Sequence, residues 1–105
     1  SYTVNNTEVL VGPRLDLDSR GGCSQEFFNS IGGWLVVTES YVEYPITANV
    51  RWFPWKEGKE PLPDHTLYGS MKILNFWINE LKLPRVYIHC DLGSHRAPTV
   101  FGAFL

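Results

Sequence analysis

Two short apolar runs, each of the length of a strand, most constrain what this chain can fold into. Residues 34–38 have the sequence Trp-Leu-Val-Val-Thr, and residues 85–89 have the sequence Arg-Val-Tyr-Ile-His. A continuous run rich in apolar and β-branched residues is typical of a strand buried on both faces, as in a parallel sheet. Parallel strands need a crossover connection between them, which is usually a helix. The two runs therefore predict an α/β domain.

Helical patterns lie before, between and after the two runs. A short helix is expected after Ser24, and a second helical pattern covers residues 97–105. Between the runs, Asp64 is predicted to cap a helix that Leu83-Pro84 ends. Its apolar positions recur at the spacing of one buried helical face and are Leu67, Met71, Leu74, Ile78 and Leu81. The order of these elements predicts a single central, mostly parallel sheet flanked by helices.

The remaining segments predict a hairpin and a long irregular connection. Residues 2–4 and 8–11 are strand-like, with Asn5-Asn6 as the turn between them. Residues 39–65 are rich in proline and contain one short strand-like stretch, residues 50–53. A loop of this length is usually functional or packed on the surface.

Composition limits the number of domains and excludes several classes of function. A chain of 105 residues closes around a single core, so residues 1–105 are expected to form one domain. The formal net charge is −2 and lysines and arginines form no run, which excludes neutralisation of nucleic-acid phosphates as the main activity. No segment has the apolar length to cross a membrane, and no secretory signal is visible at the start. Two cysteines are too few for a disulfide scaffold, so the cytoplasm is the expected location.

The segment from His89 to Thr99 contains the residues that are candidates for a functional site. A strand is expected to end at His89 and a helix to begin near Arg96, so that six residues turn between them. Backbone N–H groups in such a loop converge on one point and form a cradle for an anion, and the helix N-terminus adds about half a positive charge. The loop residues are Asp91, Leu92, Gly93, Ser94 and His95, with Gly93 placed where the turn needs a close backbone approach.

Two side chains at this cradle predict nucleophilic catalysis on a phosphate. Cys90 would lie at its rim, where a helix N-terminus and a nearby guanidinium favour the reactive thiolate. Arg96 offers a planar, permanently charged fork that matches two phosphoryl oxygens. The thiolate would attack phosphorus, and Arg96 with the loop amides would stabilise the charge of the transition state.

The motif resembles the signature of the protein tyrosine phosphatase superfamily. His89-Cys90 is followed by five residues and Arg96, with Gly93 third after the cysteine. The continuation Arg96-Ala97-Pro98-Thr99 and the small size are most similar to the dual-specificity branch. The resemblance implies a phosphatase-like fold and hydrolysis of phosphomonoesters through a phosphocysteine on Cys90, without a metal or other cofactor. Substrates would be phosphoproteins or small phosphomonoesters, with no nucleic acid or membrane as partner.

The resemblance also assigns supporting roles. A general acid, normally Asp in the family, would come from the loop before the amphipathic helix, where Glu57 falls in register and Glu60 is an alternative. His89 would orient the loop, and Thr99 would serve in packing or a local helix bond. Members of the family continue beyond this point with further helices. Such helices are expected to be missing here, so that a missing segment or a partner would cover the apolar residues Phe101, Phe104 and Leu105.

Departures from the family pattern leave an alternative function open. Ala97 stands where the family usually has Ser or Thr, whose hydroxyl helps the thiolate leave in the second step. A catalytically weak phosphate-binding module of the same fold is therefore the second hypothesis. The loop contains no lysine, which disfavours substrates that carry several phosphates. Aromatic residues of the long connection, Trp52, Phe53 and Trp55, are candidates for the entrance, although core burial is expected for Phe53.

Two structural alternatives to the catalytic interpretation remain. Cys90 can be a buried structural cysteine at the end of a strand. A metal site would combine His89, Cys90, Asp91 and His95, which supply suitable ligand atoms. Consecutive residues on a strand point to opposite faces, which disfavours that site.

Overall fold

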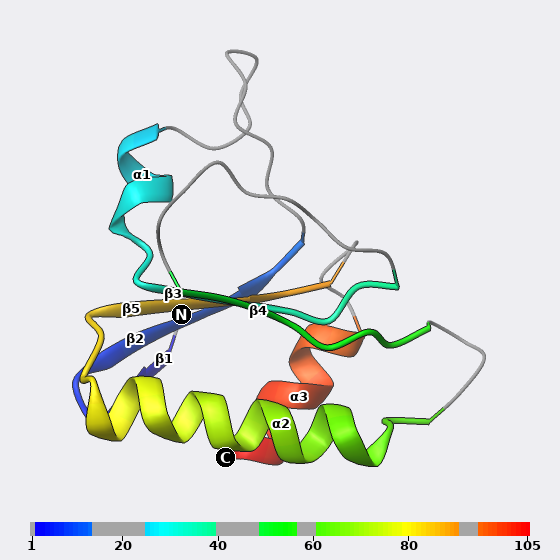
Figure 1. Cartoon of the computed structure of the whole chain (residues 1–105). Helices are drawn as coiled ribbons and strands as arrows, with labels where there is room; N and C mark the ends of the chain where they lie inside the picture. Colours follow the sequence, from blue (N-terminus) through cyan, green and yellow to red (C-terminus); the bar gives the residue numbers. More distant parts are fainter. Residues whose placement is uncertain (1, 14–24, 40–48, 57–60, 91–94) are drawn as a thin grey trace.

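The computed structural model describes residues 2–13, 25–39, 49–56, 61–90 and 95–105, in which five strands form one sheet (Figure 1). The order across the sheet is β1-β2-β5-β3-β4. β1 pairs antiparallel with β2, and all other neighbours pair in parallel. The strands are β1 (Tyr2–Val4), β2 (Thr7–Gly12), β3 (Gly33–Val36), β4 (Asn49–Trp52) and β5 (Arg85–His89). The predicted mostly parallel central sheet is confirmed.

Helices cover both faces of the sheet. α1 (Gln25–Ser30) lies on one face, and α2 (Asp64–Asn75) and α3 (Arg96–Phe104) lie on the other (Figure 1). α2 continues into η1 (Phe76–Glu80), a turn of π-helix. Ser24, after which this helix is expected to begin, lies outside the described residues. Within the described ranges, no helix has both the length and the apolar character needed to cross a bilayer.

Each face of the sheet has its own core. Along β5 the side chains alternate, so that Val86 and Ile88 face α2 and α3 while Tyr87 faces α1. The smaller core, on the α1 side, consists of Phe28, Ile31, Trp34 and Tyr87. The larger core includes Val9, Leu35, Leu74, Trp77, Ile88 and Val100. Burial of β3 and β5 on both faces agrees with their continuous apolar sequences.

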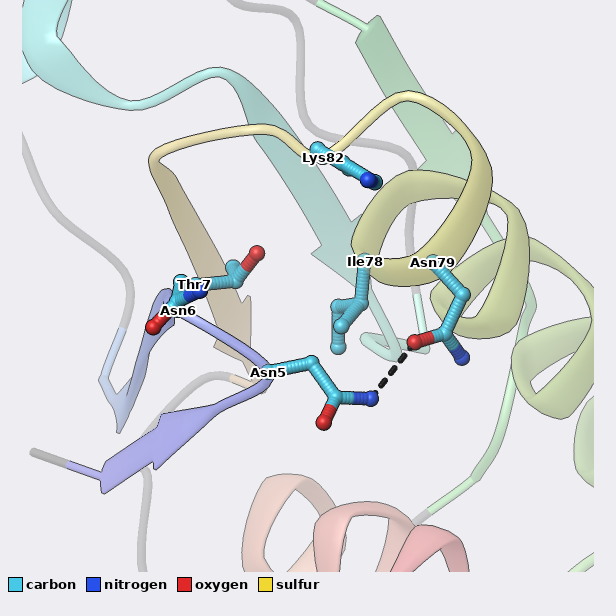
Figure 2. Close-up of a pocket in the computed structure, with 6 residues that line it drawn as sticks. All are labelled: Asn5, Asn6, Thr7, Ile78, Asn79 and Lys82. Carbon is cyan, nitrogen blue, oxygen red and sulfur yellow. Dashed lines mark hydrogen bonds between the residues drawn. The ribbon is translucent and has the colours of Figure 1, made fainter.

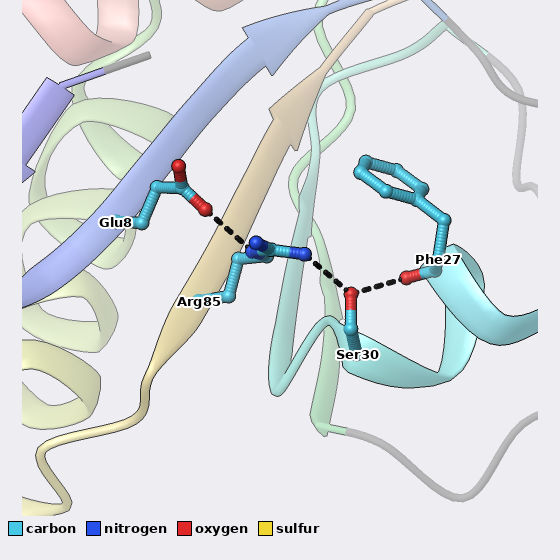
Figure 3. A network of polar contacts seen from close by, with 4 residues as sticks. All are labelled: Glu8, Phe27, Ser30 and Arg85. Carbon is cyan, nitrogen blue, oxygen red and sulfur yellow. Dashed lines mark hydrogen bonds and ion pairs between the residues drawn. The ribbon is translucent and has the colours of Figure 1, made fainter.

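A polar network fastens α1 to the amino end of the sheet (Figure 3). The Arg85 Nε donates to Glu8 Oε1 at 2.5 Å, and its Nη1 donates to Ser30 Oγ at 2.8 Å. Ser30 Oγ donates in turn to the Phe27 carbonyl at 2.5 Å. The Arg85 guanidinium also lies 5.7 Å from the centre of the Phe27 ring, within the range of a cation–π contact. One arginine therefore joins β2, β5 and α1.

The buried face of the long helix differs from the predicted one. Leu74 and Ile78 are fully buried as expected, but Leu81 is 46% exposed. The other residues buried on this face are Thr66, Ser70 and Trp77, whereas Leu67 and Met71 are partly buried. The π-helical turn at η1 explains the change at Leu81, because its N–H bonds to Phe76 five residues back rather than four. The wider turn rotates Leu81 away from the core.

The prediction that Asp64 caps this helix is wrong. Pro63 occupies the N-cap position with φ −67° and ψ 145°, and no side chain bonds the first amides. A capping residue must be extended, whereas Asp64 is already the first helical residue. Asp64 thus acts on α2 only as a negative charge in its first turn, where such a charge is favourable.

The expected cover over the last helix is unnecessary for Phe101. Its side chain is only 4% exposed, packed in the larger core and 5.1 Å from the Tyr2 ring. Phe104 is partly buried against the same core, and Leu105 is exposed. The helical periodicity of residues 97–105 predicts an apolar face on α3. Phe101 lies at the centre of that face and is buried by other described residues.

Candidate functional site

The topology of the sheet indicates that the candidate site lies at its carboxyl end, beside β5. This strand lies at the centre and pairs in parallel with β2 and β3. The next helix after β2 is α1 on one face, and the next helix after β5 is α3 on the other (Figure 1). In open α/β sheets, neighbouring strands whose connections leave to opposite faces mark the position where ligands bind. Gly12 and His89 pair at this end, and Cys90 follows directly.

Cys90 and His89 face opposite sides of the sheet. Cys90 is 1% exposed and packs in the larger core together with Trp55 and Ala97. The buried His89 ring instead lies on the side of Trp34, with ring centres 6.4 Å apart. The His89 Nδ1 is 3.0 Å from the Cys90 carbonyl oxygen, which suits an Nδ1–H donor. His89 can therefore support the backbone at Cys90, while the two side chains do not converge on one metal.

No metal-binding group of side chains is found within the described ranges. In that part of the chain, no three His, Cys, Asp or Glu residues gather closely enough to hold an ion. Asp91, one of the four residues in the metal alternative, lies outside it.

Arg96 is the first residue of α3 and is turned into the protein. Only 2% of it is exposed, and its Nη1 donates to the Trp55 carbonyl at 2.7 Å. A guanidinium is costly to bury, so a position this deep must be fixed by its surroundings. α3 packs against both β5 and β2, which brings the start of this helix to the carboxyl end of the sheet. The only permanently charged group of the predicted site is thus fixed beside the strand that precedes Cys90.

The segment that follows β4 positions the Trp55 carbonyl. The Trp55 N–H donates to the Thr38 carbonyl at 3.4 Å, beyond the end of β3. From the other side, Thr66 Oγ1 of α2 donates to the Pro54 carbonyl at 3.3 Å. The Trp55 side chain is 3% exposed and belongs to the larger core. The Trp55 carbonyl therefore reaches Arg96, while its ring packs in the core that contains Cys90.

His95 and Thr99 form the first turn of α3. His95 is the exposed N-cap residue, and its ring centre lies 6.0 Å from that of Trp55. Its carbonyl accepts two hydrogen bonds from Thr99, one from Oγ1 at 2.7 Å and one from the N–H at 3.0 Å. Thr99 makes the local helix bond that the sequence predicted, and it keeps His95 next to Arg96.

The other residues expected at the site lie outside the described residues. These are Glu57, Asp91, Leu92, Gly93 and Ser94, together with the alternative acid Glu60. Trp55 is the common neighbour of Cys90, His95 and Arg96: it packs in the same core as Cys90, its ring lies near that of His95, and its carbonyl accepts from Arg96. His89 and Thr99 contact the backbone of Cys90 and His95. Ala97 is fully buried beside them and has no hydroxyl to offer.

No sequence pattern predicts the Trp55 carbonyl as a partner of Arg96. Every residue has a backbone carbonyl, so no residue type marks such a contact. Two neighbouring residues give an indirect indication that this segment is held in place. Pro54 directly precedes Trp55, and Thr66 lies in the first turn of the following helix.

Comparison with protein-family models, with curated proteins and with solved structures found no match for this chain. The function must therefore be argued from the chemistry of the site itself.

Proposed function

We propose that this chain is a cysteine-dependent phosphomonoester hydrolase of the protein tyrosine phosphatase type, similar to the dual-specificity branch. One observation carries the proposal. A cysteine directly follows the central strand at the carboxyl end of the sheet, and a buried arginine six residues later is the first residue of the next helix. This pairing joins a nucleophile to a fixed positive charge where this class of sheet binds ligands.

In the proposed first step, the Cys90 thiolate attacks the phosphorus of the bound ester. A bond forms between sulfur and phosphorus, and the bond between phosphorus and the ester oxygen breaks. The leaving oxygen takes a proton from a carboxylic acid, for which Glu57 is the candidate. The Arg96 guanidinium stabilises the charge on the phosphoryl oxygens as the bonds change.

In the proposed second step, water attacks the phosphocysteine. The carboxylate formed in the first step takes a proton from the water, and the sulfur–phosphorus bond breaks. Inorganic phosphate leaves and the thiolate is restored. No metal or other cofactor takes part in either step. A thiolate nucleophile needs a reducing compartment, so we place the activity in the cytoplasm.

The preferred substrates are phosphoproteins or small phosphomonoesters. Two features support this choice. The sequence of the loop, residues 91–95, contains an aspartate and no lysine, so substrates with several phosphates gain no added attraction. The exposed His95 at the start of α3 also offers a ring beside the site.

A second candidate function, a phosphate-binding module with little turnover, is favoured by Ala97. The residue after the arginine is fully buried and lacks the hydroxyl that would assist the release of sulfur in the second step. Under this alternative, the site would bind an oxyanion or hold phosphate on Cys90 without efficient hydrolysis.

Hydrolysis of an aryl phosphate by the wild-type chain and two cysteine variants tests the proposal. Cys90→Ser should reduce turnover by at least about 1,000-fold, because the nucleophile is removed. The matched control, Cys23→Ser, changes the other cysteine and should retain activity. Turnover that survives in Cys90→Ser would refute the mechanism.

Vanadate binding and the Ala97→Ser variant separate the two candidate functions. An efficient hydrolase shows steady turnover, whereas a binding module shows vanadate binding with a single burst or no product. Ala97→Ser should accelerate the second step, which rapid-quench kinetics would detect as a shorter-lived phosphocysteine. Absence of both turnover and vanadate binding would exclude both functions.

A further inference from the structure

A polar cavity of about 340 Å³ opens at the other end of the sheet, away from Cys90. It lies between the β1–β2 hairpin, the π-helical turn η1 and the segment that leads to β5 (Figure 2). Its lining residues are Asn5, Asn6, Thr7, Ile78, Asn79 and Lys82. A volume of this size accommodates a small ligand.

Unusual backbone conformations are concentrated around this cavity. Within the described ranges, three non-glycine residues have positive φ: Asn5 at 47°, Asn6 at 71° and Lys82 at 52°. All three line the cavity, and for lysine this conformation is uncommon. η1, which contributes Asn79, is a π-helical turn, a feature often found at functional sites. Strained residues also cluster at ligand clamps, so the cavity is a candidate binding site.

A directed chain of amides forms one wall of the cavity. Asn5 Nδ2 donates to Asn79 Oδ1 at 2.7 Å, and Asn79 Nδ2 donates to Asn75 Oδ1 at 2.7 Å. Figure 2 shows the Asn5 and Asn79 side chains turned toward each other. The direction of the chain uses the N–H of Asn5 and keeps its Oδ1 as an acceptor. This wall can therefore accept a hydrogen bond from a ligand.

The cavity has one positive charge to offer. Lys82 is exposed and, in the described part of the chain, is the only ionisable residue that lines it. Thr7 adds no free donor, because its buried Oγ1 donates to the Leu83 carbonyl at 2.6 Å. A single ammonium balances a monoanion such as a carboxylate, whereas a phosphate dianion would need a second cation.

We propose that this cavity binds a small carboxylate that carries a hydrogen-bond donor next to the acid group. The carboxylate would bind the Lys82 ammonium, and the donor would bind Asn5 Oδ1. A free hydroxy acid has this chemistry, and so does the carboxyl terminus of a peptide, whose last N–H lies beside the carboxylate. The site is separate from Cys90, which follows the opposite end of β5. The proposal that the cavity binds a carboxylate is therefore independent of the phosphatase proposal.

Chemical-shift titration of the nitrogen-15-labelled chain tests the proposal with three probes. Glycolate represents the free hydroxy acid, N-acetylglycine represents the peptide terminus, and acetate has the carboxylate alone. The side-chain NH₂ signals of Asn5 and Asn79 should move, with millimolar affinity for a ligand this small. Binding of glycolate alone would identify a hydroxy acid, and binding of N-acetylglycine alone would identify a peptide terminus.

Two lysine variants make the test specific. Lys82→Asn removes the charge and keeps a residue type that tolerates positive φ, so the fold should persist. It should weaken binding by about tenfold or more. Lys72→Gln removes an equal charge from an exposed site on α2 that does not line the cavity, and it should leave binding unchanged.

Three results would overturn the proposal. They are Asn5 and Asn79 signals that do not move with any of the three probes, binding by Lys82→Asn as tight as that of the wild type, and binding of acetate as tight as that of the donor-bearing acids. Phosphatase activity serves as a separate readout, because it should be the same in Lys82→Asn and in the wild type.

Discussion

The two ends of the sheet are built on different physical principles. At the carboxyl end, Cys90 and Arg96 are almost completely buried, and backbone groups and the core fix their positions. At the amino end, Asn5, Asn79 and Lys82 are exposed. Asn5 and Lys82 have positive φ, and hydrogen bonds between amide side chains hold Asn5 and Asn79. Buried charges are costly to leave unsatisfied, whereas exposed pairs contribute little each. Substitutions should therefore have large effects at the first end and small effects at the second.

The largest effect is expected for Arg96→Lys. The ammonium keeps the charge but loses the planar fork and the reach to the Trp55 carbonyl. Turnover of an aryl phosphate should fall by about 100-fold to 1,000-fold, the usual range for loss of a group that stabilises transition-state charge. Steady-state kinetics measure the loss, and it should appear in kcat.

The matched control for this change is Arg51→Lys. Arg51 is exposed on the edge strand β4, so its replacement should leave kcat unchanged. Equal losses in the two variants would show that the burial of Arg96 has no catalytic importance.

A smaller effect is expected for Gly12→Ala, which tests packing at the carboxyl end. A Cβ at Gly12 would lie 2.6 Å from the Tyr87 hydroxyl oxygen, which donates to the Pro13 carbonyl at 2.8 Å. The forced shift should cost about 1–3 kcal/mol of the free energy of unfolding, measured by urea denaturation. Gly102→Ala is the control, because a Cβ there meets nothing within 4 Å and should stabilise α3 by up to about 1 kcal/mol. Equal stability of the two variants would contradict this packing.

At the amino end, Asn6→Gly should stabilise the chain slightly. Asn6 has a φ of 71° at the second turn position of the β1–β2 hairpin, where glycine is favoured. Removing the strain should add about 0.5 kcal/mol or less, since asparagine already tolerates this conformation. Asn6→Ala at the same position should be destabilising. The hairpin geometry is refuted if alanine and glycine are equally tolerated in thermal unfolding.

The smallest effect is expected for Glu8→Gln. The ion pair between Glu8 and Arg85 is about one-third exposed, with side-chain exposures of 36% and 34%, so solvent screens much of its attraction. Loss of the charge should cost about 0.5 kcal/mol, and added salt should diminish the difference between variant and wild type. Glu39→Gln, which breaks a longer and more exposed pair with Lys56, should have no measurable effect. A cost that is unaffected by salt would contradict the electrostatic origin.

The sequence predicts the strands well because their burial on both faces demands an unusual composition. β3 and β5 are fully apolar over most of their length, which few other structures tolerate. The turn at Asn5 and Asn6 was also predictable, because asparagine tolerates positive φ. The start of α3 at Arg96 followed from the segment after β5. At the site, the predicted strand β5 and helix α3 are sufficient to place Cys90 and Arg96 at the carboxyl end of the sheet.

The parts that the sequence does not predict depend on backbone geometry. The π-helical turn at η1 changes which side of the helix faces the core, and a pattern with a period of 3.6 residues cannot anticipate it. Pro63 takes the N-cap position although Asp64 has the better capping side chain. The bond from Arg96 to the Trp55 carbonyl joins segments far apart in sequence through a group that every residue has.

The strand order has a consequence for how the chain is made on the ribosome. β2 and β3 do not pair with each other, and β5, which comes last in sequence among the strands of the described residues, pairs with both. A nascent chain that has not yet extended past residue 84 holds two half-sheets with no strand to join them. Such non-local pairing slows folding and leaves strand edges open to association. The segment that joins the two half-sheets is therefore the one that leads into the proposed nucleophile, so a chain that stops before residue 85 lacks both the central strand and Cys90.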